Sequence, residues 1–389
     1  MNVLRKAVKK KKVAYVSGTR ADFGLMTPVL DAIRKSHKLE LQLYATGMHL
    51  MPQFGKTLSE VQKRFPRAAA IDVRFDINDL EGTAKFCAEF LEKIVHVFSK
   101  KKPDFVLTLG DRPEMLCVAL VCLYLNIPSG QLHGGEKTRT FDEISRHAIT
   151  KLSHLHFPAT IESAKRIEKM GEEKWRIHIV GAPAIDVIIN EKLPSRQKLF
   201  KGLGLDIKDK IILVVQHPVS DEWRRAGQQM KETIAALKSF KLPKVVIYPN
   251  ADAGSRDIIE VINREKNNPL FKIFPSLSFE QFLALEKEAA VWVGNSSGAI
   301  IESSSFHTPV VNIGTRQAGR GRVSNIINVG YNRNEIKRAV EKSLKNRSYL
   351  KGLKTVINPW GDGRTGPKVV RILEKLEITP QLLSKQITY

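Results

Sequence analysis

Short apolar runs alternate along this chain with longer segments in which apolar residues recur every three or four positions. Such runs are typical of buried strands, and the longer segments are typical of amphipathic helices. Strands that alternate with helices predict parallel sheets joined by right-handed crossovers. The predicted strands are Val13–Val16, Leu39–Thr46, Ile71–Phe75, Phe105–Leu109, Ser129–Leu132, His156–Pro158, Ile177–Val180, Ile211–Val215, Lys244–Tyr248, Lys272–Phe274, Ala289–Val293 and Pro309–Ile313.

The alternation breaks at a lysine-rich segment, residues 188–210, and restarts with the strand at Ile211. A chain of 389 residues is also too long for one hydrophobic core. We therefore predict an α/β protein with two doubly wound domains facing across a cleft. The first domain covers residues 1–187 and the second covers residues 188–366. Residues 367–389 are expected to form a C-terminal helix that packs back towards the first domain.

The formal net charge of +23 raises the question of nucleic-acid binding. The sequence has no helix-turn-helix, zinc-finger or aromatic RNA-binding pattern, and much of the excess lysine is spread along predicted helix faces. We therefore expect a small anionic ligand, a nucleotide, and no nucleic-acid partner.

The sequence gives no sign of a membrane or secreted protein. No apolar run approaches the roughly 20 residues of a membrane helix, and the basic start leads directly into a strand, unlike a secretory signal. Cys87, Cys117 and Cys122 lie in apolar helical patterns without metal-ligand spacing. We expect a cytoplasmic protein with reduced cysteines and no membrane partner.

A polar turn follows the apolar run at residues 289–293. Asn295, Ser296 and Ser297 suit the start of a helix, and Gly298 lets the backbone approach a ligand. Glu302 lies about two helical turns further on. A strand, a polar turn and a helix together form an anion site, because free N–H groups and the helix dipole favour phosphate.

Three arginines follow the next predicted strand, at positions 316, 320 and 322. Arginine binds phosphate oxygens through a bidentate fork. An ordinary capped helix followed by a solvated basic loop would explain the serine turn alone. Glu302 and the arginines together favour a cradle for a nucleotide diphosphate.

Charged residues also gather at the strand ends of the first domain. Asp111 and Arg112 follow one buried strand, and His133 and Glu136 bracket a Gly-Gly pair after the next. Asp142 begins the helix that follows. Unpaired charge at a buried strand end is costly, so these residues indicate a site more than a structural Asp–Arg pair. Carboxylates and histidine are the groups that move protons in enzymes.

Other polar residues nearby have simpler interpretations. Glu143 is best read as a first-turn acid that complements the helix dipole. His147 and His154 lie within helical runs as structural histidines. Nothing supplies the closed tetrahedral ligand set of a metal site.

Taken together, these blocks resemble the hydrolysing UDP-N-acetylglucosamine 2-epimerases of sialic acid biosynthesis. The matching segments occur in one order from Val13 to Arg364, and RHAITKLSHLHF and NIGTRQAGR are the most specific. The others include GTRADFG, GDRPEM, HGGE, GAPAIDVI, QHPV, YPNADAGS and GNSSGAIIES.

The resemblance implies two Rossmann-like domains, the first holding the sugar and the second holding UDP. The implied reaction is an anti elimination of UDP to a 2-acetamidoglucal, followed by addition of water with inversion at carbon 2. The products are N-acetylmannosamine and UDP, and no metal or other cofactor takes part. We expect a bacterial-type homodimer or homotetramer without the kinase domain of the animal relatives.

The resemblance also implies residue roles. Asp111 is the first choice for proton transfer at the sugar, and Asp142 is the second. His217 matches a histidine that contacts the diphosphate and could protonate the leaving group. Animal relatives carry Glu at the position of His133, so the division of acid–base work between His133 and Glu136 stays open.

The remaining positions implied by the resemblance bind substrate. Glu302 would accept the ribose hydroxyls, and Arg112 and Asn250 match further active-site positions whose roles are not separated. The positions implied at the diphosphate are Arg20, Ser296, Ser297 and Arg316.

Several alternatives remain open. A hydrolysing enzyme of the same family could act on UDP-N,N'-diacetylbacillosamine in legionaminic acid synthesis. A non-hydrolysing 2-epimerase would return UDP to the glucal, and a glycosyltransferase of the same fold would pass the sugar to an acceptor. A basic nucleic-acid-binding protein rests on net charge alone and predicts steep salt dependence.

Overall fold

The computed structural model describes residues 10–74, 80–138, 141–250, 252–321 and 323–388. Within these ranges strands and helices alternate, as the hydrophobic pattern predicts. The first domain contains β1 (Lys11–Ser17), α1 (Arg20–Lys35), β2 (Leu39–Ala45), α2 (Leu58–Arg64), β3 (Ala69–Ala70), α3 (Leu80–Lys100), β4 (Phe105–Leu109), α4 (Pro113–Tyr124), β5 (Ser129–Leu132), α5 (Phe141–Leu152), β6 (Leu155–Phe157), α6 (Ile161–Lys169) and α7 (Pro183–Asn190).

The second domain repeats the alternation and is followed by two helices near the C-terminus. Its elements are α8 (Arg196–Leu203), β7 (Ile211–Val215), α9 (Ala226–Lys238), β8 (Lys244–Ile247), α10 (Ser255–Asn263), β9 (Phe271–Phe274), α11 (Phe279–Glu288), β10 (Ala289–Gly294), α12 (Ser297–Ile301), β11 (Val310–Ile313), β12 (Ile326–Val329), α13 (Arg333–Lys345) and α14 (Arg347–Leu353). The last two helices are α15 (Thr365–Lys375) and α16 (Pro380–Leu383).

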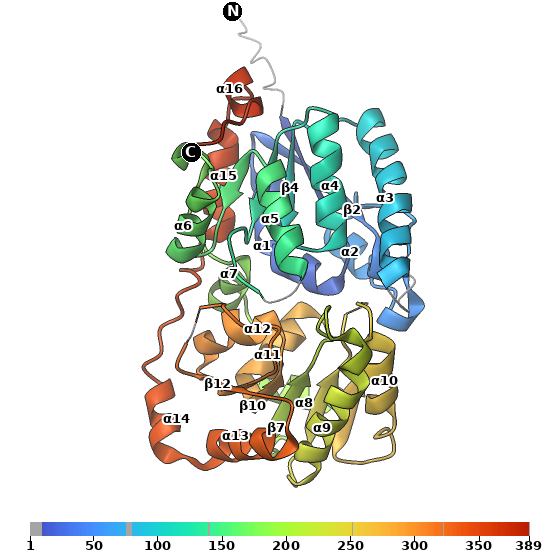
Figure 1. Ribbon diagram of the computed structural model, residues 1–389, viewed down its shortest axis with the longest axis vertical. Coiled ribbons are helices and arrows are strands. Elements are labelled where there is room, and N and C mark those ends of the chain that lie inside the picture. Colours follow the sequence, from blue (N-terminus) through green and yellow to red (C-terminus); the bar gives the residue numbers. More distant parts are fainter. Residues whose placement is uncertain (1–9, 75–79, 139–140, 251, 322, 389) are drawn as a thin grey trace, which may run out of the picture.

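The strands form two six-stranded sheets, one in each of two domains stacked along the long axis of the molecule (Figure 1). The strand order is β3-β2-β1-β4-β5-β6 in the first sheet and β12-β11-β10-β7-β8-β9 in the second. All the strand pairs in these orders are parallel. Both orders are the doubly wound order of a Rossmann-like domain. The predicted α/β architecture is confirmed.

Alternate residues of β1 face opposite sides of the first sheet. Val13 and Tyr15 join a core that includes residues of α1, whereas Ala14 and Val16 join a core that includes residues of α3. Because helices cover both faces, the strand is apolar along its length and does not alternate with polar residues. This explains why a short continuous apolar run predicted β1.

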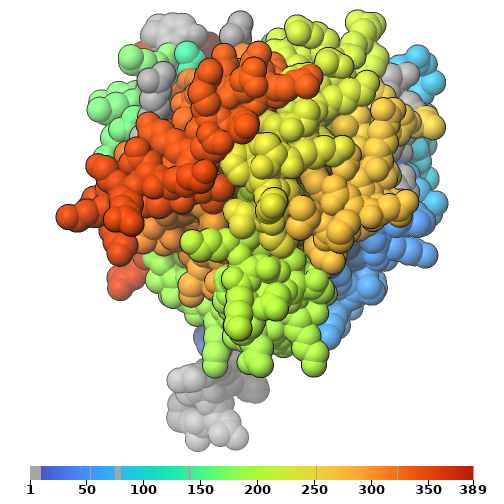
Figure 2. Space-filling model, turned by 90° about the horizontal axis from the view of Figure 1, so that it is seen from below, coloured from blue at the N-terminus to red at the C-terminus, as the bar shows by residue number. Residues whose placement is uncertain are grey.

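Helices also shield the second sheet. Figure 2 views the second domain from below, where α9 packs against both α10 and α13. Met230 of α9 and Ile336 of α13 share a core with residues of β7 and β10. Val215 and Ile247, the last residues of β7 and β8, line a cavity together with residues of the first domain, so these strands end on the side that faces it.

Two predicted elements are wrong. Residues 177–180 form no strand, and Ile177 makes only an isolated bridge to His156. The segment 188–210, predicted as a linker, contains α8, whose Leu199 is buried. Its lysines lie on the outer face and obscured the apolar spacing of an ordinary amphipathic helix.

One edge strand lies at a different position from the predicted strand, and a second edge strand was not predicted. β3 is only two residues long and precedes the predicted strand at residues 71–75, of which residue 75 lies outside the described ranges. β12 pairs with β11 at the sheet edge, and its residues are half-buried or exposed. Edge strands pack on fewer neighbours, so their apolar signal is weaker. α13 and α14 were missed with it.

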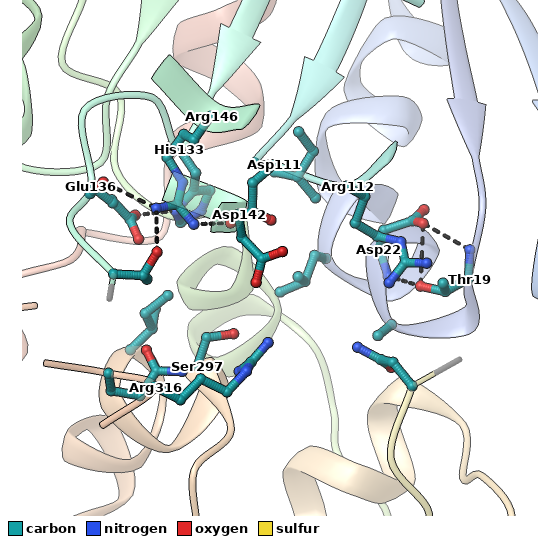
Figure 3. A pocket seen from close by; sticks show the side chains of 18 of the residues that line it. Thr19, Asp22, Asp111, Arg112, His133, Glu136, Asp142, Arg146, Ser297 and Arg316 are labelled. Carbon is teal, nitrogen blue, oxygen red and sulfur yellow. Dashed lines mark hydrogen bonds and ion pairs between the residues drawn. The ribbon is translucent and has the colours of Figure 1, made fainter. Parts of the chain in front are cut away.

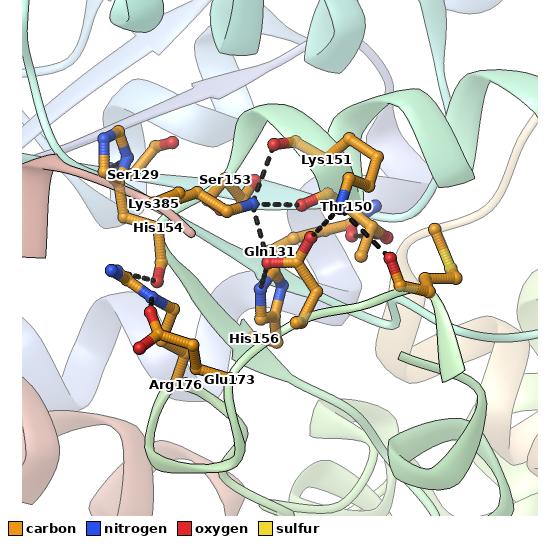
Figure 4. Close-up of polar contacts among 12 residues, drawn as sticks. Ser129, Gln131, Thr150, Lys151, Ser153, His154, His156, Glu173, Arg176 and Lys385 are labelled. Atoms are coloured by element: carbon orange, nitrogen blue, oxygen red, sulfur yellow. Dashed lines mark hydrogen bonds and ion pairs between the residues drawn. The ribbon is translucent and has the colours of Figure 1, made fainter. Parts of the chain in front are cut away.

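The chain returns to the first domain after α14. α15 packs against α1 and α7 (Figure 1), and Asp186 accepts hydrogen bonds from Thr365 N and Gly366 N, both at 2.8 Å. Further on, Lys385 Nζ donates to the Ser153 carbonyl at 2.7 Å, beyond the end of α5 (Figure 4). The predicted domain limits at 187/188 and 366/367 remain a prediction.

No helix in the described ranges combines the length and the apolar composition needed to cross a membrane.

Candidate active site

Two adjoining cavities lie between the domains, at the carboxyl ends of the strands of both sheets. Their volumes are about 170 Å³ and 180 Å³. Each is smaller than the roughly 300–1,000 Å³ of a typical ligand site. A ligand the size of a nucleotide sugar would therefore have to span both.

The fold brings every residue of the predicted site into this cleft, although the sequence separates them by almost 300 positions. Asp111, Arg112, His133, Glu136 and Asp142 line only the first cavity. Arg20, His217 and Ser296 line only the second cavity. Both cavities are lined by Asn250, Ser297, Glu302 and Arg316.

Asp111 is held at the end of β4 by a buried network. Gly110 has φ +69°, a conformation that glycine adopts without strain. Arg146 of α5 is almost fully buried and forms an ion pair with Asp111. Gln131 Nε2 donates to the carbonyls of Gly110 at 2.9 Å and Arg146 at 3.1 Å. The Asp111 carboxylate therefore faces the first cavity in a fixed position beside a cation (Figure 3).

The HGGE turn places His133 beside Glu136. His133 has φ +58° and Gly135 has φ +72°. A Cβ atom at Gly135 would lie 2.3 Å from the Ser163 carbonyl oxygen, so only glycine fits there. The turn brings His133 Nδ1 to within 2.5 Å of Glu136 Oε1. A left-handed conformation at a non-glycine residue is uncommon and often marks a functional site.

Arg320 reaches Glu136 from the second domain. Its Nη2 atom lies 2.5 Å from Glu136 Oε2, and both side chains are buried. Burial alone would raise the pKa of Glu136, but the charges of Arg320 and His133 hold it well below its usual range. Arg320 was predicted to bind phosphate, and here its partner is a carboxylate instead. Arg322, the third predicted arginine, lies outside the described residues.

Asp142 and Glu143 share the first turn of α5 but have different surroundings. Asp142 points into the first cavity (Figure 3). Glu143 Oε2 accepts a hydrogen bond from Thr138 N at 2.6 Å, and its Oε1 atom pairs with His147 at 3.4 Å. Glu143 therefore has the structural role expected of it, and Asp142 is the acid of this turn that can meet a ligand.

Asn295 joins the strand ends of β7 and β10. Its Oδ1 atom accepts from His217 N at 2.7 Å, and its Nδ2 atom donates to the His217 carbonyl at 3.0 Å. Ser296 occupies the N-cap position of α12 but makes no capping hydrogen bond through its side chain. The predicted capping role is therefore wrong: Asn295 braces a neighbouring loop, and Ser296 and Ser297 face the cavities.

His217 is a neutral imidazole in this environment. Burial, together with the charges of Arg316 and Arg112, lowers its pKa well below the usual value. Its Nδ1 atom accepts a hydrogen bond from Asn250 N at 3.2 Å. The proton must therefore lie on Nε2, and His217 can donate a hydrogen bond from that atom to an anion in the second cavity.

Two arginines flank the second cavity. Arg316 Nη1 donates to the Asn295 carbonyl at 3.1 Å, which leaves its other guanidinium N–H groups available to the cleft. Arg20 donates to Ser276 Oγ at 2.8 Å and forms an ion pair with Glu60. Both arginines, from opposite domains, thus lie where an anionic group would be held.

Glu302 closes the inner wall of both cavities and is buried. A Cβ atom at Gly298 would lie 2.9 Å from Glu302 Oε2 and 3.1 Å from the Trp292 ring. The glycine therefore makes room for this carboxyl group. Gly298 also lines the second cavity, and its role in the close approach of a ligand stays a prediction.

Two buried charges beside the predicted site residues, Arg146 in the wall of the first cavity and Glu114 behind Arg112, were not predicted. Arg146 lies one helical turn after Asp142, a spacing at which side chains share a helix face. Glu114 is fully buried in the apolar helix α4 and its Oε2 atom lies 3.2 Å from Arg112 Nε. The spacing of four residues from Asp142 could have indicated Arg146. The presence of one acid in an otherwise apolar helix could have indicated Glu114.

His154 has the structural role expected of it. His154 Nδ1 accepts from Ser129 N at 3.1 Å, and burial lowers the pKa of His154 to about 4. In the part of the chain that the structure describes, no three His, Cys, Asp or Glu side chains are arranged to hold a metal ion.

Known proteins share this sequence pattern and fold. The sequence model of the UDP-N-acetylglucosamine 2-epimerase family matches residues 31–374. This chain belongs to that family. The predicted resemblance to these epimerases is thereby confirmed.

Individual family members resemble the chain over nearly its whole length. UDP-N,N'-diacetylbacillosamine 2-epimerase (hydrolyzing) of Legionella pneumophila is 37% identical over 97% of this chain and 100% of that protein. UDP-N-acetylglucosamine 2-epimerase of Neisseria meningitidis serogroup B is 33% identical over 86% of this chain and 87% of that protein. The crystal structure of UDP-GlcNAc 2-epimerase from Neisseria meningitidis bound to UDP-GlcNAc shares the fold, with a TM-score of 0.76, 18% identity and coverage of 94% and 100% of the two chains.

Proposed function

We propose that this family member is a hydrolysing 2-epimerase that converts UDP-N,N'-diacetylbacillosamine and water into UDP and the free 2-epimeric sugar. One observation carries the proposal: carboxylates of the first domain and the arginine and histidine side chains of the second line one cleft. Such a cleft can hold an anionic leaving group beside groups that move protons.

The second cavity suits the diphosphate. Arg316 offers a guanidinium fork, and neutral His217 offers Nε2–H. A bound diphosphate would oppose the effect of the Arg316 charge on His217 and so raise the affinity of His217 for a proton. His217 can then protonate the departing oxygen as the bond from carbon 1 to the diphosphate breaks.

Proton transfer at carbon 2 needs two groups. A base removes the proton of carbon 2 as UDP leaves, which gives the 2-acetamidoglucal. Water then adds its oxygen to carbon 1, and an acid delivers a proton to the opposite face of carbon 2. Asp111 and Asp142 reach the first cavity from different elements, and we assign them these transfers. Glu136, which Arg320 and His133 hold in its ionised form, orients Asp111 and Asp142 or the attacking water.

The choice of sugar rests on relatives and on the cavity wall. The Legionella pneumophila relative, named for diacetylbacillosamine, has higher identity than the Neisseria relative, named for N-acetylglucosamine. The first cavity also has apolar wall residues, among them Leu25, Leu109 and Ile301. A 6-methyl group and a second acetamido group suit such a wall better than hydroxyl groups do.

UDP-N-acetylglucosamine is the second candidate substrate and the first expectation from the sequence. The 33% identity to the Neisseria relative favours it. An apolar pocket distinguishes single small groups only about 10- to 200-fold. The enzyme could therefore turn over both nucleotide sugars, and the ratio of the two kcat/KM values decides between them.

Proton NMR in heavy water tests the proposal. Each UDP sugar is incubated separately with the protein. Free sugar with deuterium at carbon 2, together with UDP, supports a hydrolysing epimerase, and a higher kcat/KM for the diacetylbacillosamine nucleotide supports that substrate. A deuterated sugar still linked to UDP indicates the non-hydrolysing reaction. No reaction with either nucleotide overturns the proposal and favours a glycosyltransferase.

A further inference from the structure

Two buried carboxyl groups meet behind the second cavity. Glu302 follows α12 and reaches both cavities, whereas Glu286 belongs to the last turn of α11 and reaches neither. Glu286 is fully buried, and Glu302 is 4% exposed. Their side chains are hydrogen-bonded to each other. No sequence pattern indicated Glu286, which lies at the end of an ordinary amphipathic helix.

The local structure forces this contact. Glu286 is one helical turn beyond Phe282, whose ring packs edge-on against Trp292 of β10 at 5.5 Å. Trp292 in turn lies beside Gly298, and the absence of a side chain there leaves space for the Glu302 carboxyl group. Gly298 and the aromatic pair thus fix where the two acids meet.

The surroundings supply little compensation for negative charge. Within the described residues, no group outside this pair donates a hydrogen bond to either oxygen of Glu286 or to Oε2 of Glu302. Among the described residues, Glu286 interacts with the charge of Glu302, and Glu302 interacts with Glu286 and with the charge of His133. Two adjacent carboxylates without a cation cannot both ionise at moderate pH. Burial raises the pKa of both groups. The contact raises the pKa of Glu286 further, well above its usual value, whereas the hydrogen bond from Glu286 lowers the pKa of Glu302.

We propose that Glu286 is a positioning residue that donates its carboxyl proton to Glu302 and holds Glu302 as an ionised acceptor for the vicinal hydroxyls of a bound ribose. A carboxylate at the strand ends of a Rossmann-like fold is a known type of ribose acceptor. Here the acceptor depends on a second acid that the ligand never touches. The inference rests on the proposed binding of a UDP sugar in this cleft.

Retention of the Glu286 proton makes the ribose contact depend on pH. Below the pH at which Glu286 ionises, its O–H group fixes the Glu302 carboxylate. Above that pH the two carboxylates repel each other, and Glu302 moves from its position. Glutamine at position 286 would keep an N–H donor at every pH, whereas alanine would remove the donor and leave a cavity.

Calorimetry with UDP and 2′-deoxy-UDP tests this inference in the intact protein. The ratio of the two dissociation constants reports the ribose contact, because titration of the diphosphate affects both ligands equally. The ratio is measured between pH 6 and pH 9 for the wild type, Glu286→Gln and Glu286→Ala. Glu288→Gln is the control, because Glu288 ends the same helix but pairs with Arg196 away from the cleft.

We expect the wild type and Glu288→Gln to prefer UDP about tenfold or more at pH 6 and to lose most of that preference by pH 9. Glu286→Gln should keep the preference across the range, and Glu286→Ala should show almost none. A preference in Glu286→Gln that declines as in the wild type overturns the inference, even where the alanine variant does not fold. If the wild type binds UDP without preference over 2′-deoxy-UDP at any pH, the inference is wrong but the proposed function is not affected. If the wild type does not bind UDP at all, both the inference and the proposed function are wrong.

Discussion

Arg320 Nη2 lies 2.5 Å from Glu136 Oε2 and joins the loop after β11 of the second domain to the loop after β5 of the first. The pair is buried, so its charges interact more strongly than in water. His133 binds the other oxygen of the same carboxylate at 2.5 Å. A residue of the second domain thus controls the charge and orientation of an acid in the first, and the cleft is complete only when both domains meet.

Replacing Arg320 should change how activity depends on pH. In Arg320→Ala, Glu136 loses the cation that keeps its pKa low, so the carboxylate should accept a proton at a higher pH. We expect the acid limb of kcat/KM to move to higher pH and the maximum to fall about 100-fold. Arg320→Lys retains the charge without the fork and should show a smaller change. An unchanged pH profile in Arg320→Ala would mean that Glu136 takes no part in the reaction.

Asp111 and UDP binding should be separable. Asp111→Asn keeps the size of the side chain but removes its basicity and weakens the ion pair with Arg146. We expect turnover to fall by about 100-fold or more, with UDP affinity within about threefold of the wild type, since Asp111 lines only the first cavity. Single-turnover kinetics and calorimetry measure the two effects. Normal turnover in this variant would remove Asp111 from the proton-transfer assignment.

Arg316 should contribute to the binding of the diphosphate. Arg316→Ala removes a guanidinium fork from the second cavity, and we expect UDP to bind at least about tenfold more weakly. Gln317 still donates to the Asn295 carbonyl at 2.9 Å in that variant, so the loop should keep its conformation. Arg333→Ala is a matched control, because Arg333 pairs with Glu232 on an exposed surface. Equal UDP affinity in both variants would exclude Arg316 from the phosphate site.

The sequence predicted the position of the site better than it predicted the contacts of the charged residues there. Asp111 and His217 follow apolar strands, and the ends of parallel strands meet at one edge of a sheet. That rule predicted Asp111 in the site, whereas the role of His217 came from the resemblance to the epimerase family. The partners Arg146 and Arg320 come from a helix and from another domain, and no local pattern records such contacts. No role was predicted for Glu286 for the same reason, because its partner Glu302 is 16 positions away on a different element.

In the fold as well, the buried elements were predicted better than the exposed ones. Buried strands such as β1 and β7 were predicted because burial on both faces makes them apolar throughout. Edge strand β12 was not predicted because it is short and its residues are half-buried or exposed. Helix α13 was not predicted because its composition is mostly polar. The C-terminal helix was expected to pack back towards the first domain, and α15 contacts α1 there. The partner helix of α15 could not be predicted, because spacing within α15 does not determine it.

The C-terminal tail binds the end of α5 outside the cleft. Lys385 Nζ lies 2.7 Å from Glu172 Oε2 and donates to the carbonyls of Thr150, Lys151 and Ser153 (Figure 4). A cation beside the last carbonyls of a helix stabilises it. Lys385→Met should lower the free energy of unfolding by about 2 kcal/mol. Lys368→Met, which breaks an exposed pair with Asp362, should cost about 0.5 kcal/mol or less.

The pH dependence of unfolding distinguishes this ion pair from simple packing. Burial opposes ionisation of Glu172, but hydrogen bonds from His156, Lys151 and Lys385 lower the pKa of Glu172 to about 2. In the unfolded chain its pKa is about 4.3, so the unfolded state binds the proton first. This contribution is present above about pH 4.3 and is lost as the pH falls towards 2. Urea unfolding at pH 7, 4.5 and 3 should show wild type and Lys385→Met converging at acid pH. A constant difference across that range would indicate that Lys385 acts only by packing.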